Sequence, residues 1–231
     1  VAIEPGRYTT ILEPQAVCDL VGQLVFDTDY FAPLSRRHNE EEDSTVGPFL
    51  KTPPRQPQPG FSRLGERIVD ERITISADPT DAALGFPPVN TEWSDSATFF
   101  TNCTVYHPVT WINQGVLANL AHDRNYGVTE LGETTGLPNS GAFRMSGGST
   151  SIEEMIRTTE RGMLVTRFDS VYMLDQTSLL CRGFTRDGLW LIERGKISKP
   201  VKNMAFTESI LFALNNVEQL GPPQRTFHPH P

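Results

Sequence analysis

The sequence is poor in cysteine, has no dense run of Lys and Arg, and has no apolar run that approaches membrane-spanning length. Its three cysteines, Cys18, Cys103 and Cys181, lie far apart, which argues against a disulfide framework and indicates a reducing, cytoplasmic setting. The formal net charge is −8 at pH 7, which argues against a broad phosphate-contacting surface, so we do not expect nucleic acid as a partner. The missing apolar run gives no reason to expect a membrane partner either.

The 231 residues include 18 Pro and 18 Gly, which suits turns and short strands better than long helices. β-branched and alternating patterns predict strands at 8–12, 72–76, several within 99–119, 163–168, 178–185 and 188–193. Asp187-Gly188 predicts a hairpin turn between the last two strands, and further turns are predicted at 113–115 and 193–196. We therefore expect an α+β fold dominated by antiparallel, barrel-like sheets, with about three helices.

Three segments have helical character. Pro14 opens the first, where a missing N–H costs nothing, and an apolar stripe follows at Val17, Leu20, Val21, Leu24 and Val25. The second helix is predicted over 151–161. Two residue pairs could form its capping box: Thr150 with Glu153, or Ser151 with Glu154. The third begins with Thr207 as its cap and ends before Gly221.

The segment 35–60 differs in composition from the rest of the chain, with blocks of charge followed by a Pro-rich stretch. Such a segment cannot bury much surface, so we expect a long exposed loop, interpreted as a solvated insertion rather than a lid or a partner-binding arm. The expected organisation is a strand and helix in 1–34, the loop in 35–60, and a β-rich domain with two further helices in 61–231. Because the chain opens without a Met, we expect it to continue a longer protein.

No catalytic constellation is evident from the residues alone. The cysteines lie in apolar or regular settings, which favours core roles. His228-Pro229-His230 has no third metal ligand nearby, so a dedicated metal site is not favoured. The residues 147–151 precede a helix and could hold an anion, but Glu153 and Glu154 would repel phosphate, and helix capping is the preferred interpretation.

Several stretches taken together resemble the TldD/PmbA family. They occur in family order at 11–14 (Ile-Leu-Glu-Pro), 111–117, 147–156, 161–167, 185–197 and 200–209. The resemblance implies the central and carboxy-terminal, β-rich part of a two-part protein. Family members were once described as modulators of DNA gyrase and are regarded as zinc peptidases and their inactivated relatives. An active member pairs with a metal-free one to form a chamber that cleaves or matures unfolded peptides.

In active members the helix after the Glu-Pro strand carries His-Glu-x-x-x-His, and a later Cys completes the zinc site. Counted from Pro14, the three motif positions fall on Gly22, Gln23 and Asp27. None of these can replace an imidazole ligand, and Gln23 cannot serve as the carboxylate base. The resemblance also leads us to expect that the final strand region of the family, where the ligand Cys would lie, is missing after Pro223. The resemblance is therefore to the inactivated branch, with no catalytic residue and no cofactor in this chain, and with zinc expected only in an active partner.

The leading hypothesis is a non-catalytic subunit that binds extended peptides and supports a metallopeptidase partner, as a dimer with an active homologue or with itself. The expected peptide-binding residues lie in the polar segment 122–136: Arg124, Asn125, Tyr126, Thr134, Thr135 and Gly136. A structural turn is an equal interpretation of that segment. Two alternative functions stay open: a regulatory interaction module of the gyrase-modulator type, and a peptidase with an unrecognised site.

Overall fold

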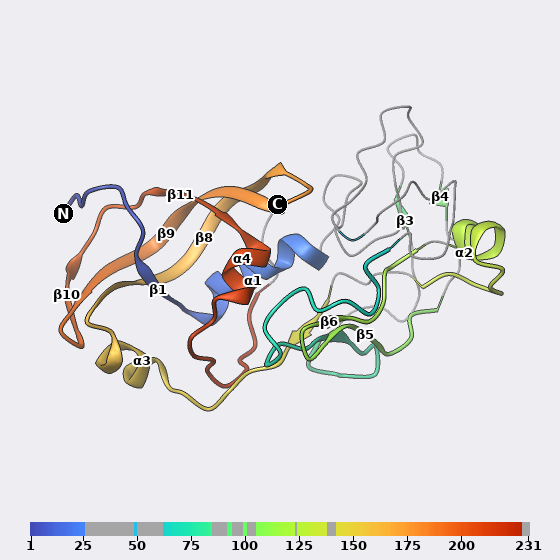
Figure 1. Ribbon diagram of the computed structural model, residues 1–231, viewed down its shortest axis with the longest axis horizontal. Helices are drawn as coiled ribbons and strands as arrows, with labels where there is room; N and C mark the ends of the chain where they lie inside the picture. Colours follow the sequence, from blue (N-terminus) through green and yellow to red (C-terminus); the bar gives the residue numbers. More distant parts are fainter. Residues whose placement is uncertain are drawn as a thin grey trace. The chain divides into compact units, whose positions relative to one another are not determined.

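The computed structural model describes residues 1–25, 49, 62–84, 92–93, 99–100, 105–122, 124–137 and 142–227 (Figure 1). The chain divides into two compact units. Unit 1 comprises Val1–Gln23 and Ser146–Pro231, and unit 2 comprises Leu24–Met145. Asp27, Cys103, His228 and His230 lie outside the described residues, as does most of the segment 35–60. The exception in that segment is Phe49, which is buried and accepts a hydrogen bond at its carbonyl from the N–H of Arg63, so the expectation of exposure is wrong there.

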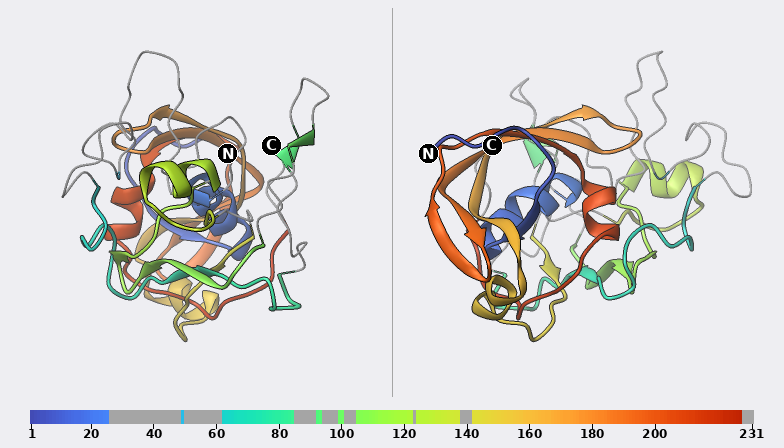
Figure 2. Two further views of the ribbon diagram at one scale, coloured as in Figure 1. Left: turned by 90° about the vertical axis from the view of Figure 1, so that its right-hand side faces the viewer. Right: turned by 60° about the vertical axis from the view of Figure 1, so that its left-hand side comes forward.

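Unit 1 is built on a five-stranded sheet of β1 (Thr9–Leu12), β8 (Arg161–Asp175), β9 (Leu180–Glu193), β10 (Lys196–Pro200) and β11 (Ala205–Ser209). The strand order is β1-β8-β9-β10, and β11 pairs with the other half of β9. β1 runs parallel to β8, while the remaining pairs are antiparallel. In the described residues this sheet stays open and forms no closed barrel. The long β8–β9 hairpin curves over the first helix (Figure 2).

The strand prediction is wrong at Asp187-Gly188, which form no hairpin turn but lie inside the continuous strand β9. The pairing of β8 with β9 shifts register between Val165 and Arg167, so these residues form a bulge opposite Thr166. Asp187 has a φ of 63°, and a Cβ on Gly188 would lie 2.4 Å from the Oγ1 of Thr166. The same Asp-Gly preference for left-handed backbone that favours a turn is used here in a bulge. The turn predicted at 193–196 is confirmed between β9 and β10.

Unit 1 contains α3 (Ile152–Thr158), α4 (Ile210–Asn215) and α1 (Pro14–Val25) except for the last two residues of α1, which belong to unit 2. α1 begins at Pro14 as predicted. α3 is shorter than expected because β8 starts at Arg161. Its N-cap is Ser151, whose hydroxyl accepts from the backbone N–H of Glu154 at 3.2 Å. The N-cap of α4 is Ser209 rather than the predicted Thr207, because residues 205–209 belong to β11.

The core of unit 1 lies where β1 meets β8 and β9. Ile11, Leu164 and Ile192 are buried together, and one face of α3 packs against them through Ile152, Met155 and Ile156. The predicted apolar stripe of α1 is confirmed at Leu20, Val21, Leu24 and Val25, which are buried, while Val17 is only half-buried. This packing fixes α1 by its apolar face, since burial of apolar surface is the main favourable term in folding.

Unit 2 contains a four-stranded sheet in the order β6 (Val116–Leu117), β5 (Val109–Asn113), β2 (Ile75–Ala77) and β7 (Arg144–Met145). The two-residue loop between β5 and β6 is Gln114-Gly115, with φ values of 47° and 78°, which is the left-handed pattern of a type I′ hairpin turn and confirms the predicted turn. A separate pair is formed by β3 (Glu92–Trp93) and β4 (Phe99–Phe100).

A fourth helix in the described residues, α2 (Arg124–Glu130), was not predicted. Its sequence, Arg-Asn-Tyr-Gly-Val-Thr-Glu, contains a Gly and little apolar periodicity, so no pattern announces it. Short helices of this kind depend on their tertiary surroundings rather than on propensity. None of the helices in the described part of the chain combines the length and apolar character needed to cross a membrane. The α+β class is confirmed.

Candidate functional site

One face of α1 carries polar and small residues at three- and four-residue spacing: Gln15, Cys18, Asp19, Gly22 and Gln23. Residues with this spacing lie on the same side of a helix, and the buried apolar stripe of α1 occupies the other side. This polar face of α1 contacts the segment 226–227, which lies beyond the end of α4 in the chain.

Gln15 holds the main chain of Phe227 with both ends of its side-chain amide. The N–H of Phe227 donates to Gln15 Oε1 at 3.0 Å, and Gln15 Nε2 donates to the carbonyl oxygen of Phe227 at 3.2 Å. The thiol of Cys18 also donates to that oxygen, at 3.6 Å, and lies near the side chain of Thr226. Phe227 is 87% exposed, so its contact with α1 is made by its backbone and not by its side chain.

Asp19 sits behind Gln15 and orients it. The second N–H of Gln15 Nε2 donates to Asp19 Oδ1 at 2.8 Å, and Asp19 Oδ2 accepts from the backbone N–H of Phe168, on β8, at 2.9 Å. Asp19 is only 5% exposed. Burial raises the pKa of its carboxyl group above the ordinary value, and the hydrogen bonds from Gln15 and Phe168 oppose that rise. These hydrogen bonds fix the orientation of the Gln15 amide, and with it the directions of its donor and acceptor atoms.

The two described thiols are not suited to nucleophilic chemistry. Burial raises the pKa of Cys181 to about 12, and burial also raises the pKa of Cys18. A thiol attacks as the thiolate, so a raised pKa lowers its reactivity near neutral pH. This agrees with the structural role expected for both residues.

The segment 122–137 is closed on itself. His122 and Leu137 form a backbone bridge with two hydrogen bonds of 2.9 Å each. The ring of His122, 5% exposed, meets Glu133 Oε2 through Nε2 at 2.7 Å and the carbonyl oxygen of Leu120 through Nδ1 at 3.2 Å. Both ring nitrogens of His122 therefore have a hydrogen-bonding partner within the segment 120–133.

The peptide-binding residues predicted in this segment are placed as follows. Arg124, Asn125 and Tyr126 lie in the first turn of α2, with the Tyr126 ring 6.2 Å from the His122 ring. Thr134 and Thr135 are exposed on the return of the loop, and Gly136 is buried. α2 packs closely on this return, because a Cβ on Gly127 would lie 2.4 Å from the carbonyl oxygen of Thr135. The structure brings the two halves of the predicted set into one loop, and their peptide binding stays a prediction.

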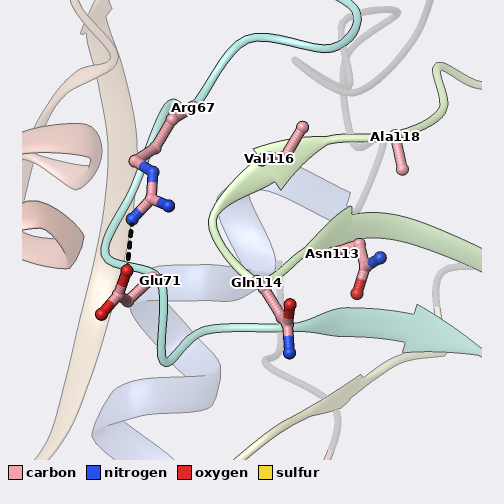
Figure 3. A pocket seen from close by; sticks show the side chains of 6 residues that line it. All are labelled: Arg67, Glu71, Asn113, Gln114, Val116 and Ala118. Atoms are coloured by element: carbon pink, nitrogen blue, oxygen red, sulfur yellow. Dashed lines mark hydrogen bonds and ion pairs between the residues drawn. The ribbon is translucent and has the colours of Figure 1, made fainter.

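Unit 2 also has an open hollow of about 560 Å³ beside the β5–β6 turn (Figure 3). It is lined by Arg67, Glu71, Asn113, Gln114, Val116 and Ala118. Arg67 donates to Glu71 across 2.9 Å, and both side chains are more than half exposed, so the pair adds little to stability. The sequence pattern did not single out this hollow.

Comparison with known proteins decides the family. A family model described as the PmbA/TldA metallopeptidase C-terminal domain matches residues 5–230. The chain belongs to the TldD/PmbA family. No curated protein matches the chain.

Several solved structures share the fold of this chain. A proposed modulator of DNA gyrase from Bacteroides thetaiotaomicron is 18% identical, with a TM-score of 0.67 over 96% of this chain and 43% of its own. TldE from Thermococcus kodakarensis is 16% identical, with a TM-score of 0.64 over 92% and 44%. A proposed modulator of a DNA gyrase from Thermotoga maritima is 17% identical, with a TM-score of 0.63 over 96% and 46%. The chain spans less than half the length of each of these relatives.

The positions at which the TldD/PmbA resemblance expects zinc ligands do not fit a metal in this chain. Gly22 is buried on α1 and has no side chain, Gln23 is half-buried, and Asp27 lies outside the described residues. Among the residues that the structure describes, no group of three or more His, Cys, Asp or Glu side chains gathers closely enough to hold a metal ion. A zinc site needs three or four such ligands.

The contact of Gln15 with Phe227 was missed by sequence reasoning. One local signal was present: Gln15 and Asp19 are four residues apart, a spacing at which Gln and Asp side chains hydrogen-bond along a helix. The partner segment lies 212 residues away in sequence, and no local pattern connects it to α1.

Proposed function

We propose that this TldD/PmbA-type chain is a non-catalytic subunit that binds extended peptides and supports a metallopeptidase partner in peptide maturation or proteolysis. The observation that carries the proposal is that the side-chain amide of Gln15 hydrogen-bonds with both the N–H and the C=O of Phe227. In an extended chain the N–H and C=O of one residue point to the same side, so one amide can bind both whatever the side chain is. This is the chemistry needed to hold unfolded peptides of varied sequence.

The position of this grip supports the same function. Gln15 lies two helical turns before Gly22 on the polar face of α1, and Gly22 and Gln23 stand where the resemblance expects the metal motif of an active member. A helix face that has lost its ligand types while keeping an oriented backbone-binding amide suits a subunit that holds a peptide without cutting it. We propose a cytoplasmic dimer with an active homologue, or with itself.

The experiment uses the full-length protein with and without a homologue that carries His-Glu-x-x-x-His. Zinc content and hydrolysis of an unfolded peptide are measured for each protein alone and for the mixture. We expect no stoichiometric zinc and no hydrolysis for this protein alone, complex formation with the homologue, and faster hydrolysis by the complex than by the homologue. Stoichiometric zinc together with chelator-sensitive hydrolysis by this protein alone would overturn the proposal and favour the peptidase alternative.

A regulatory interaction module is the second candidate. It is favoured by the description of two similar structures as proposed modulators of DNA gyrase. The two functions separate in a binding assay with a folded gyrase subunit and an unfolded peptide offered in parallel. Binding of the gyrase subunit without binding of peptide would favour the regulator.

A further inference from the structure

We propose that residues 226–227 occupy a peptide-backbone site on α1, formed by Gln15 and Cys18 with Asp19 behind them, and that an extended peptide binds there by displacing them. This deepens the proposed function and rests on it, because it names the site, the group of the peptide that is recognised, and the segment that competes for it.

The site is built to hold a backbone. Gln15 uses its oxygen for the N–H of Phe227, one N–H for the carbonyl of Phe227, and its other N–H for Asp19. Asp19 is buried and tied to the main chain of β8 at Phe168, so the amide cannot turn without losing bonds at both ends. An amide fixed in this way loses little further conformational entropy when a ligand binds.

The stretch of chain that leads to residues 226–227 is held by backbone hydrogen bonds at residues 220–221. There, Gly148 N–H donates to the carbonyl of Gly221 at 2.8 Å and Thr150 N–H donates to the carbonyl of Leu220 at 3.2 Å. A Cβ on Gly148 would lie 2.3 Å from that Leu220 oxygen, so this contact is tightly packed. At the other end, Phe227 is held through its backbone by the side chains of Gln15 and Cys18.

The exposed ring of Phe227 distinguishes this contact from ordinary packing. A segment that is retained to complete a core buries its large apolar side chains, whereas this ring is left in solvent beside the polar face of α1. The hydrogen bonds of the contact do not depend on the side chain at position 227. Any extended residue that offers an N–H and a C=O can therefore take its place.

The test uses the full chain and two substitutions at Phe227. Phe227→Pro removes the N–H that Gln15 accepts, while Phe227→Ala keeps it. Because the ring is exposed, neither substitution threatens folding. The probe is a fluorescently labelled synthetic peptide with the sequence of residues 220–227, and its binding is followed by fluorescence anisotropy. A second probe carries N-methyl phenylalanine at its last position.

We expect Phe227→Pro to tighten binding of the first probe about fivefold relative to both Phe227→Ala and the unsubstituted chain, which is the effect of one lost competing hydrogen bond. The N-methyl probe should lose a similar factor. Adding Gln15→Met to Phe227→Pro should remove the gain, because methionine keeps the length of the side chain but offers no amide.

Two results would overturn the inference. One is equal binding of the first probe by Phe227→Pro and Phe227→Ala. The other is tight binding that survives Gln15→Met. If peptides still bind the protein in either case, or the homologue is still stimulated, the proposed function stands without this site. If no variant binds any extended peptide and the homologue is not stimulated, the proposed function fails with it.

Discussion

The polar face of α1 and the loop 122–137 each contain one buried titratable side chain. The two side chains differ in the distance along the sequence to the segment that they help to hold. Asp19 is anchored to backbone on one side and orients a neutral amide on the other, and that amide meets a segment more than 200 residues away. His122 meets Glu133, 11 residues on and 48% exposed, within its own loop. On α1, an amide of fixed orientation binds a segment that a peptide can replace. In the loop 122–137, the ion pair only holds the loop to itself.

This difference ranks the two regions as peptide sites. Recognition without sequence preference needs donors and acceptors directed at a backbone and held from behind, which Gln15 and Asp19 supply. In 122–137 the buried ring is committed to its own loop. The peptide binding predicted for Arg124, Thr134 and their neighbours therefore stays secondary to the site on α1.

The largest effect is expected at Asp19. Asp19→Ala leaves the buried N–H of Phe168 without its acceptor and frees Gln15, so we expect a loss of about 2–3 kcal/mol in the free energy of unfolding. Asp19→Asn is the matched control, because its amide oxygen can still accept from Phe168, and it should lose clearly less. Urea denaturation measures both. Equal losses would mean that the hydrogen bond to Phe168 contributes nothing.

The next effect tests whether the loop 122–137 is structural. Gly127→Ala places a Cβ against the Thr135 carbonyl and should cost about 2 kcal/mol of unfolding free energy, within the usual range for overpacking. Val128→Ala, at an exposed position of the same helix, should change it by less than about 0.5 kcal/mol. Peptide affinity should be unaffected in both variants. A loss of affinity with Gly127→Ala in the folded protein would move the peptide site to this loop.

A smaller effect is expected at Glu133. Glu133→Gln keeps a hydrogen bond to His122 but removes the charge, and because Glu133 is half-exposed the cost should be about 0.5–1 kcal/mol. Amide hydrogen exchange of residues 122–137 should report it as local opening. Unchanged exchange would show that the pair does not close the loop.

The smallest effect is a pH dependence that Asp19 should add. Burial raises its pKa in the folded state, so the folded protein holds this proton more tightly than the unfolded chain. The contribution of the Asp19 proton to the free energy of unfolding is fully present below the pKa of Asp19 in the unfolded chain, near 3.8. It is lost as the pH rises through the higher pKa of Asp19 in the folded protein. Unfolding free energies of the unsubstituted chain minus those of Asp19→Asn should therefore fall with rising pH. A rise over that window would contradict the assignment.

Sequence patterns predicted what is local and repeated. The start of α1 at Pro14, its apolar stripe and the turn at Gln114-Gly115 follow from spacing that the structure confirms. Sequence patterns did not predict structure that depends on contacts with residues far away in the sequence. Asp187-Gly188 became a bulge because of β8 opposite, and α2 has no strong periodicity of its own. The grip of Gln15 on Phe227 is the extreme case, since nothing near position 15 indicates which chain it will meet.

The central claim is that residues 226–227 give up the Gln15 site to an extended peptide. Its most direct test is the hydrogen-exchange rate of the Phe227 backbone amide, measured by NMR with and without a saturating amount of the unlabelled 220–227 peptide. We expect a protected amide in the free protein, because its hydrogen is bonded to Gln15, and fast exchange once the peptide is bound. Protection that is unchanged while the peptide is bound would contradict the claim.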